Sequence, residues 1–139
     1  MDIAYRINAP LSAEQVAALL SRSSLGARRP LDDPACMRGM VANSNLTVSA
    51  WDGDRLVGIA RSLTDFHYAC YLSDLAVDED YQRHGLGQAL QRLTQQQLGP
   101  RCHLIVIAAP AADDYDARLG GYERNPRCWV LARERHIGD

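Results

Sequence analysis

The sequence predicts an α/β fold in which a mixed, mostly antiparallel central sheet carries helices on both faces. Segments 46–51, 56–63 and 68–77 follow one another with short turns between them, which is typical of antiparallel strands in a meander. An amphipathic segment then leads into the apolar segment 103–109, which predicts a helical crossover to a parallel strand. Because no repeat or linker is visible, we expect one domain over residues 1–139.

The N-terminal part of the chain predicts a strand and a helix. Residues 3–7 alternate apolar and polar side chains, as a half-buried strand does. Ser12 is a favourable N-cap residue, and Gln15 stands three positions later, as in a capping box. Apolar side chains at helical spacing follow, so we predict a helix over residues 12–22.

A second helix is predicted after a loop that carries two arginines. Either Asp32 or Asp33 can cap this helix, and Pro34 is suited to its first turn. Arg28 and Arg29 precede it in a stretch bounded by glycine and proline, and we expect both side chains to lie in solvent.

A hairpin and a third strand form the middle of the predicted sheet. Asp52-Gly53-Asp54 separates segments 46–51 and 56–63, and Asp-Gly pairs favour tight turns between antiparallel strands. Asp65-Phe66-His67 makes the next turn, and segment 68–77 completes the meander.

The C-terminal half predicts two helices and two strands. The helix that begins at Gly87 ends at Gly99-Pro100. Residues 103–109 form the most hydrophobic run of the chain, which predicts a buried central strand. We expect a short helix over residues 111–119 and a final strand at residues 129–131.

The composition favours a globular protein of the cytoplasm. The net charge of −2 gives no electrostatic reason to bind nucleic acid or an anionic membrane. No apolar run approaches the ~20 residues of a membrane span, and the N-terminus shows no secretory signal. The cysteines lack metal-ligand spacing, so we expect reduced thiols and no metal. They are Cys36, Cys70, Cys102 and Cys128.

Residues 72–90 read as a strand, a glycine-bearing loop and the start of a helix. Gly85 and Gly87 stand where the helix begins, and glycine lets the backbone approach a ligand closely. The free N–H groups of a helix N-terminus favour phosphate at this place. No Gly-Lys-Ser/Thr follows, which excludes a Walker loop, and Leu90 stands where a dinucleotide fingerprint needs its third glycine.

The string Gln82-Arg83-His84-Gly85-Leu86-Gly87, preceded by Asp74-Leu75-Ala76-Val77, resembles a known signature. It is similar to the Gln/Arg-x-x-Gly-x-Gly/Ala motif of the Gcn5-related N-acetyltransferases (GNAT). The resemblance implies acetyl-CoA as the acetyl donor, with the loop on its pyrophosphate. It also implies two strands that splay apart to admit the pantetheine arm. The first two helices and their connection would form a wall of the acceptor site. Arg28 and Arg29, in that connection, could then guide an acidic acceptor or the CoA phosphates.

The resemblance assigns cofactor contacts residue by residue. Contacts with pantetheine and the oxyanion, mainly through the backbone, fall to Leu75, Ala76 and Val77. Contacts with the pyrophosphate fall to Gln82, Arg83, His84, Gly85, Leu86, Gly87 and Gln88.

The catalytic residues are open. The family often has a tyrosine before a Gly-Phe turn that protonates the leaving thiolate. The spacing here would place Asp116 at that position, but Tyr115 is the best candidate acid, because a small helical shift could bring its hydroxyl over the thiol. Asp74 could remove the amine proton through water if burial made it more basic, or it could form a structural hydrogen bond. A water relay without a dedicated base is a third possibility.

The resemblance therefore implies direct, acetyl-CoA-dependent N-acetylation of a primary amine on a small molecule. One alternative is an acyl-CoA-binding sensor or structural module of the same fold. Another is a peptide or protein N-acetyltransferase. A homodimer that pairs the strand at residues 129–131 across subunits is also conceivable.

Overall fold

A computed structural model describes residues 1–108 and 121–138 of the chain. It divides into two compact units, Met1–Ile107 and Ala108–Asp139, which we describe separately. The first unit is built on one five-stranded sheet with strand order β1-β2-β3-β4-β5. Its strands are β1 (Ile3–Ile7), β2 (Leu46–Asp52), β3 (Arg55–Thr64), β4 (Ala69–Val77) and β5 (His103–Val106).

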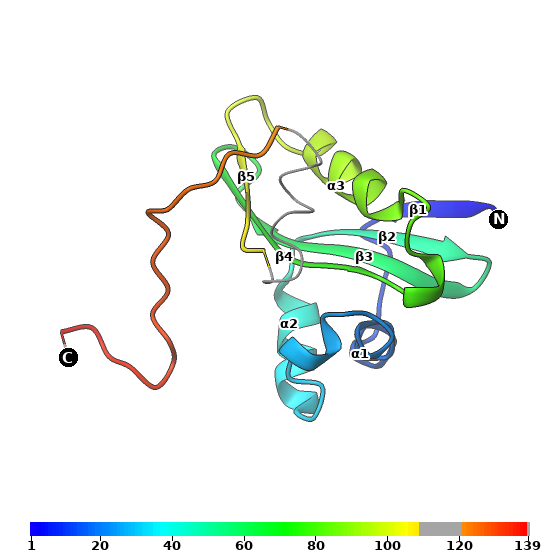
Figure 1. Cartoon of the computed structure of the whole chain (residues 1–139), viewed down its shortest axis with the longest axis horizontal. Helices are drawn as coiled ribbons and strands as arrows, with labels where there is room; N and C mark the ends of the chain where they lie inside the picture. The colour runs from blue at the N-terminus through cyan, green and yellow to red at the C-terminus, as the bar shows by residue number, and fades with distance from the viewer. Residues whose placement is uncertain (109–120, 139) are drawn as a thin grey trace. The chain divides into compact units, whose positions relative to one another are not determined.

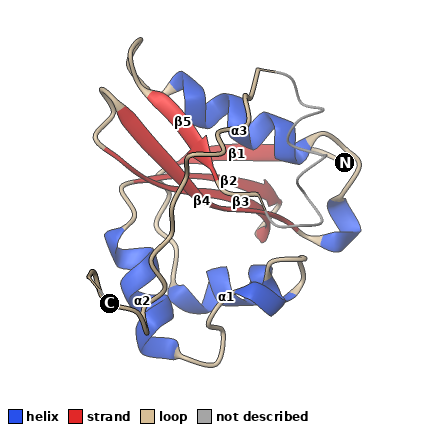
Figure 2. Ribbon diagram, turned by 60° about the vertical axis from the view of Figure 1, so that its left-hand side comes forward, coloured by secondary structure: helices blue, strands red, loops and turns tan. Residues whose placement is uncertain are grey.

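The sheet is mixed, as predicted. Strands β1 to β4 pair antiparallel in sequence order, and β5 pairs parallel with β4. Within the first unit, three α-helices and two 3-10 helices accompany the strands. They are α1 (Ala13–Ser21), η1 (Gly26–Arg28), α2 (Pro34–Asn43), η2 (Glu79–Tyr81) and α3 (Leu86–Gln96). Helices α1 and α2 cover one face of the sheet and α3 covers the other (Figures 1 and 2), which confirms the predicted fold class.

The predicted helix starts are confirmed in detail. The Ser12 hydroxyl accepts a hydrogen bond from the Gln15 backbone N–H at 3.1 Å, and the Gln15 side chain accepts one from the Ser12 N–H at 2.9 Å. This reciprocal capping box satisfies two N–H groups that the helix itself cannot bond. Asp33, rather than Asp32, caps α2 by accepting from the Cys36 N–H at 3.0 Å.

Each face of the sheet has its own apolar core. On one face, α1 and α2 bury side chains such as Leu19, Leu20 and Met37 against β2 to β4. On the other face, Leu90 of α3 packs against the meander, and a Cβ atom at Gly58 would lie only 3.1 Å from its side chain. Glycine at this position of β3 therefore lets α3 approach the sheet closely.

The Asp65 carboxylate bonds several backbone groups of the turn between β3 and β4. Asp65 accepts hydrogen bonds from the backbone N–H groups of Tyr68, Ala69 and His67, which lower its pKa to about 2.

Two strand predictions need correction. Segment 103–109 was expected to be a buried central strand, but β5 ends at Val106 and lies at the edge of the first unit's sheet, with Ile105 46% exposed. An apolar run does not distinguish a strand with two neighbours from one with a single neighbour. The strand predicted at residues 129–131 is wrong, because residues 121–138 carry no helix or strand and these three side chains are exposed.

The helix predicted over residues 111–119 lies outside the described residues. Within residues 1–108 and 121–138, no helix is long and apolar enough to cross a membrane.

Candidate functional site

The first feature of the candidate site is the point at which the pairing of β4 with β5 ends. The two strands pair over four residues, from Ala69 with His103 to Leu72 with Val106. Beyond Leu72, β4 continues through Val77, and no strand in the described parts of the chain pairs with its outer edge there. Within residues 73–77, the Ser73 carbonyl accepts from Arg29 Nη2 and the Val77 carbonyl accepts from Gln82 Nε2. The other outward-facing backbone groups of residues 73–77 can be bonded by an extended ligand with amide groups, as an added strand would bond them. We call these residues the free β4 edge.

A β-bulge marks the start of the free β4 edge. On the other side of β4, Arg61 pairs with Asp74 but Ser62 pairs with Leu72, so Ser73 is an extra residue in the ladder with β3. Bulges bend a strand and redirect its backbone groups, and they are common beside active sites. Ser73 is thus both the bulged residue and the first residue beyond the contact with β5.

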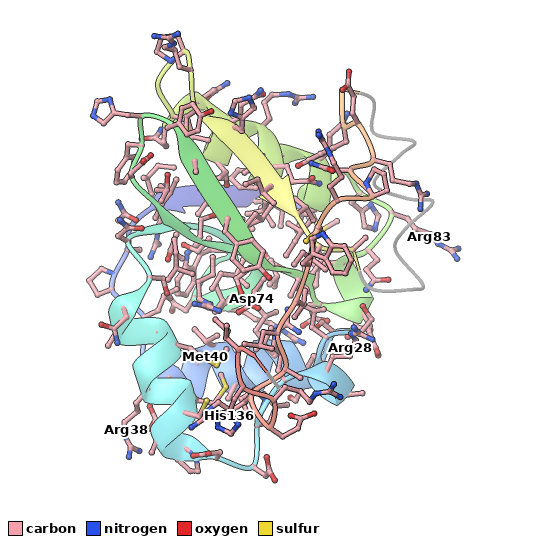
Figure 3. All side chains as sticks on the ribbon, turned by 90° about the vertical axis from the view of Figure 1, so that its left-hand side faces the viewer. Arg28, Arg38, Met40, Asp74, Arg83 and His136 are labelled. Carbon is pink, nitrogen blue, oxygen red and sulfur yellow. The ribbon has the colours of Figure 1, made fainter. Side chains whose placement is uncertain are left out.

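The loop after β4 delivers a helix N-terminus to the same end of the sheet. Gly85 is the N-cap residue of α3, with φ +81°, and it offers no side-chain cap. Among the described residues, the first N–H groups of α3 consequently have no side-chain cap, and such groups favour an anion. Arg83 also has a positive φ, 66°, which is uncommon for a residue other than glycine. Its side chain points away from the sheet in Figure 3.

A buried acid joins α1 to the end of the sheet. Asp78 is 1% exposed and accepts hydrogen bonds from Arg22 Nε at 2.7 Å and Arg55 Nη2 at 3.0 Å. Burial alone would raise the pKa of Asp78, but the bonds from Arg22, the Asp80 N–H and Arg55 lower it on balance. Arg22 also donates from Nη2 to the Leu56 carbonyl at 2.9 Å.

Asp74 lies in a second cluster of the same kind. Its carboxylate is fully buried, and its two oxygens accept from Arg29 Nε and Arg61 Nε, each at 2.6 Å. Because both oxygens are occupied by guanidinium groups, this geometry favours the structural alternative for Asp74 over a general base.

The expectation that Arg29 lies in solvent is wrong. Its side chain is only 21% exposed and is paired with Asp74, whereas Arg28 is exposed as expected. Forty-five positions separate the two partners, and no local pattern in the sequence indicates their contact. Arg61 and the bulged Ser73 were missed for the same reason.

The residues assigned to acetyl-CoA lie in two places. Leu75, Ala76 and Val77 are on the free β4 edge, and residues 82–88 form the loop and the first turn of α3. Leu86 is 3% exposed, with its side chain in the core, so only its backbone is available to a ligand. Tyr115 and Asp116 lie outside the described residues.

A cavity of about 250 Å³ opens on the sheet face that carries α1 and α2. Its lining comes from the segment between β1 and α1, the end of α2, and strands β2 and β3. Arg61 connects this cavity to the free β4 edge, because it lines the cavity and donates to the Ser73 hydroxyl at 3.1 Å.

Comparison with known proteins agrees with this geometry. The family model described as an acetyltransferase (GNAT) domain matches residues 16–127. No curated protein matches the chain.

Several solved structures share the fold. A protein of unknown function from meticillin-resistant Staphylococcus aureus superposes with a TM-score of 0.73 at 20% identity, covering 96% of this chain and 100% of that one. An aminoglycoside N-acetyltransferase in complex with CoA gives a TM-score of 0.69 at 16% identity, covering 95% of both chains. A ribosomal-protein-alanine N-acetyltransferase from Brucella melitensis gives a TM-score of 0.69 at 16% identity, covering 94% of this chain and 99% of that one.

Proposed function

The chain belongs to the GNAT family of acetyltransferases, and from this membership we propose that it transfers an acetyl group from acetyl-CoA directly to a primary amine of a small molecule. The observation that carries the proposal is the free β4 edge beside the uncapped N-terminus of α3. One structure of the same fold holds CoA, which supports the choice of donor.

The residues present fit acetyl-CoA. The backbone of Leu75, Ala76 and Val77 would bond the amide groups of the pantetheine arm, and Ser73 would lie at the thioester end of this edge. The pyrophosphate would meet the N–H groups at the start of α3, where Gly85 keeps the approach free of a Cβ atom. Gln82, Arg83, His84 and Gln88 would supply side-chain donors around it.

The reaction needs no covalent enzyme intermediate. The amine nitrogen attacks the thioester carbonyl carbon, the carbon–sulfur bond breaks, and the proton lost by the amine balances the one gained by the thiolate. The products are an amide and the free thiol of CoA. Tyr115 is our candidate for the residue that protonates the thiolate, and a Tyr115→Phe variant with unchanged turnover would remove it from the mechanism.

Proton removal from the amine is best assigned to water. Asp74 was one candidate base, but its carboxylate oxygens are both bonded to arginines and its side chain has no exposed surface. The cavity beside Arg61 lies on the sheet face that carries α1 and α2, and it can hold solvent.

The acceptor class is tested by thiol release. The purified chain would be incubated with acetyl-CoA and three sets of amines, namely aminoglycosides and other small amines, peptides with free N-termini, and peptides with free lysines. Release stimulated only by small amines supports the proposal, and release stimulated only by peptides replaces it with protein acetylation. CoA binding without release by any amine would favour an acyl-CoA-binding module, and no CoA binding would refute both.

We also propose the cytoplasm as the site of action, consistent with the scattered thiols. A homodimer stays a proposal, and sedimentation of the full chain would test it.

A further inference from the structure

Two arginines hold the bulge where the free β4 edge begins. Arg29 donates from Nη2 to the Ser73 carbonyl at 2.9 Å, and Arg61 donates from Nη2 to the Ser73 hydroxyl at 3.1 Å. Both arginines use Nε to bond Asp74, the next residue along the strand. Ser73 and Asp74 are therefore fixed from the face that carries α1 and α2, by four charge-assisted hydrogen bonds.

The same arginines connect the bulge to the helical layer. Arg61 donates from Nη1 to the Met40 carbonyl at 3.1 Å and to the Ser44 hydroxyl at 3.2 Å, at the end of α2. Arg29 follows η1, in the connection between α1 and α2, and donates from Nη1 to the Arg28 carbonyl at 2.9 Å. Figure 3 shows Asp74 between the sheet and these helices.

The contacts with Ser73 go beyond what an ion pair needs for stability. The cluster around Asp78 has the same composition, one buried carboxylate and two arginines. Among the described residues, however, its arginines donate to Asp78 and to the Leu56 carbonyl, and not to the bulge. Around Asp74, in contrast, each guanidinium also donates one hydrogen bond to Ser73, the first residue of β4 beyond its pairing with β5. A planar guanidinium fork fixes both the distance and the direction of such a contact.

We propose that Arg29 is a positioning residue for acetyl transfer. Through Ser73 and Asp74 it fixes the start of the free β4 edge, and thereby the place of the thioester carbonyl relative to the acceptor amine. The proposal rests on the proposed function. Arg29 is the better probe of the two arginines, because it is 21% exposed whereas Arg61 is 6% exposed and more embedded in the fold.

The test compares Arg29→Lys with Arg22→Lys. Lysine keeps the charge but cannot bond a carboxylate and a carbonyl with a fixed fork. Arg22 is a matched control, because it also uses Nε on a buried aspartate, at 2.7 Å, and Nη2 on a carbonyl, at 2.9 Å. We expect Arg29→Lys to lower kcat about 10- to 100-fold with the KM for acetyl-CoA within about twofold, because small displacements of reacting groups have rate effects of this size. Arg22→Lys should leave kcat within about twofold of the wild-type value. Its melting temperature should fall by about as much as that of Arg29→Lys.

Equal kcat values for the two variants would overturn the proposal, as would a raised KM for acetyl-CoA with unchanged kcat. A second measurement does not depend on finding the acceptor. Amide hydrogen exchange in a peptide covering residues 73–77 should become faster in Arg29→Lys and not in Arg22→Lys, and the absence of that difference would also overturn it. If the wild-type chain released no thiol with any amine, the proposed function would fail, and the exchange measurement would still decide the role of Arg29.

Discussion

Replacing Asp74 with asparagine tests the buried ion cluster most directly. The aspartate side chain has no exposed surface, and each of its oxygens accepts a guanidinium N–H at 2.6 Å. Asparagine keeps the shape but has one acceptor oxygen, so its NH₂ group would face a guanidinium and leave that cation unpaired. Removing one partner of a buried pair costs about 3–5 kcal/mol. In a chain of this size, that is a fall in the melting temperature of roughly 10–20 °C.

The assay is urea unfolding followed by circular dichroism. The slope of the free energy of unfolding against urea concentration is fitted for the wild-type chain and for Asp74→Asn. An unchanged slope would show that the free energy of unfolding changed, and not the compactness of either state. Asp65→Asn serves as the control, because that carboxylate is exposed and bonds the backbone N–H groups of its own turn, so a smaller loss is expected. A loss under about 1 kcal/mol for Asp74→Asn would refute the reasoning, because it is no more than a surface ion pair contributes.

Three further predictions follow from single positions. Backbone hydrogen bonds hold the pKa of Asp65 at about 2, below the ordinary 3.8. Its contribution to stability is therefore full above about pH 5 and is lost as the pH falls towards 2. Acid unfolding curves should show a smaller loss of stability over that range for Asp65→Asn than for the wild-type chain. Gly26→Ala should lower the free energy of unfolding by about 1–3 kcal/mol, because its Cβ would lie 2.8 Å from a backbone carbonyl oxygen of α1. Gly39→Ala, in open space within α2, should raise the free energy of unfolding by about 0.5–1 kcal/mol. Equal effects of the two substitutions in urea unfolding would contradict this prediction. Gly85→Ala should raise the KM for acetyl-CoA about 5- to 30-fold in the thiol-release assay. An L-residue at a φ of +81° costs about 1–2 kcal/mol, so the loop would relax in the free protein, and binding would have to restore its conformation. Gly53→Ala, with φ +60° in the hairpin turn, should leave that KM unchanged.

The parts of the fold that the sequence predicts correctly are those set by neighbouring residues. Asp52-Gly53-Asp54 places the β2–β3 turn within one residue, because the positive φ of Gly53 is a local requirement. The capping box of Ser12 and Gln15 and the start of α2 at Pro34 likewise involve contacts between residues three or four positions apart. The turn into α3 at Gly85 is local as well, because it depends on a positive φ at that one residue.

The parts that could not be predicted depend on contacts between distant segments. The pairing of Arg29 with Asp74 joins the α1–α2 connection to β4, and nothing in either segment specifies the other. The bulge at Ser73 arises from the register between β3 and β4, which side-chain alternation in one strand does not reveal. The same holds for β5, whose apolar residues predict a strand but not how many neighbours it has.

The order of the strands has a consequence for how the chain folds. The three middle strands pair through short turns, whereas β1 reaches β2 only across α1 and α2, and β5 reaches β4 only across α3. Closing a long loop costs more entropy than closing a hairpin, so the meander should form before either outer strand docks. The contact between β4 and β5, and with it the start of the free β4 edge, would then be among the last features to appear. A nucleotide ligand would accordingly slow unfolding of the chain and leave the rate of formation of the meander unchanged.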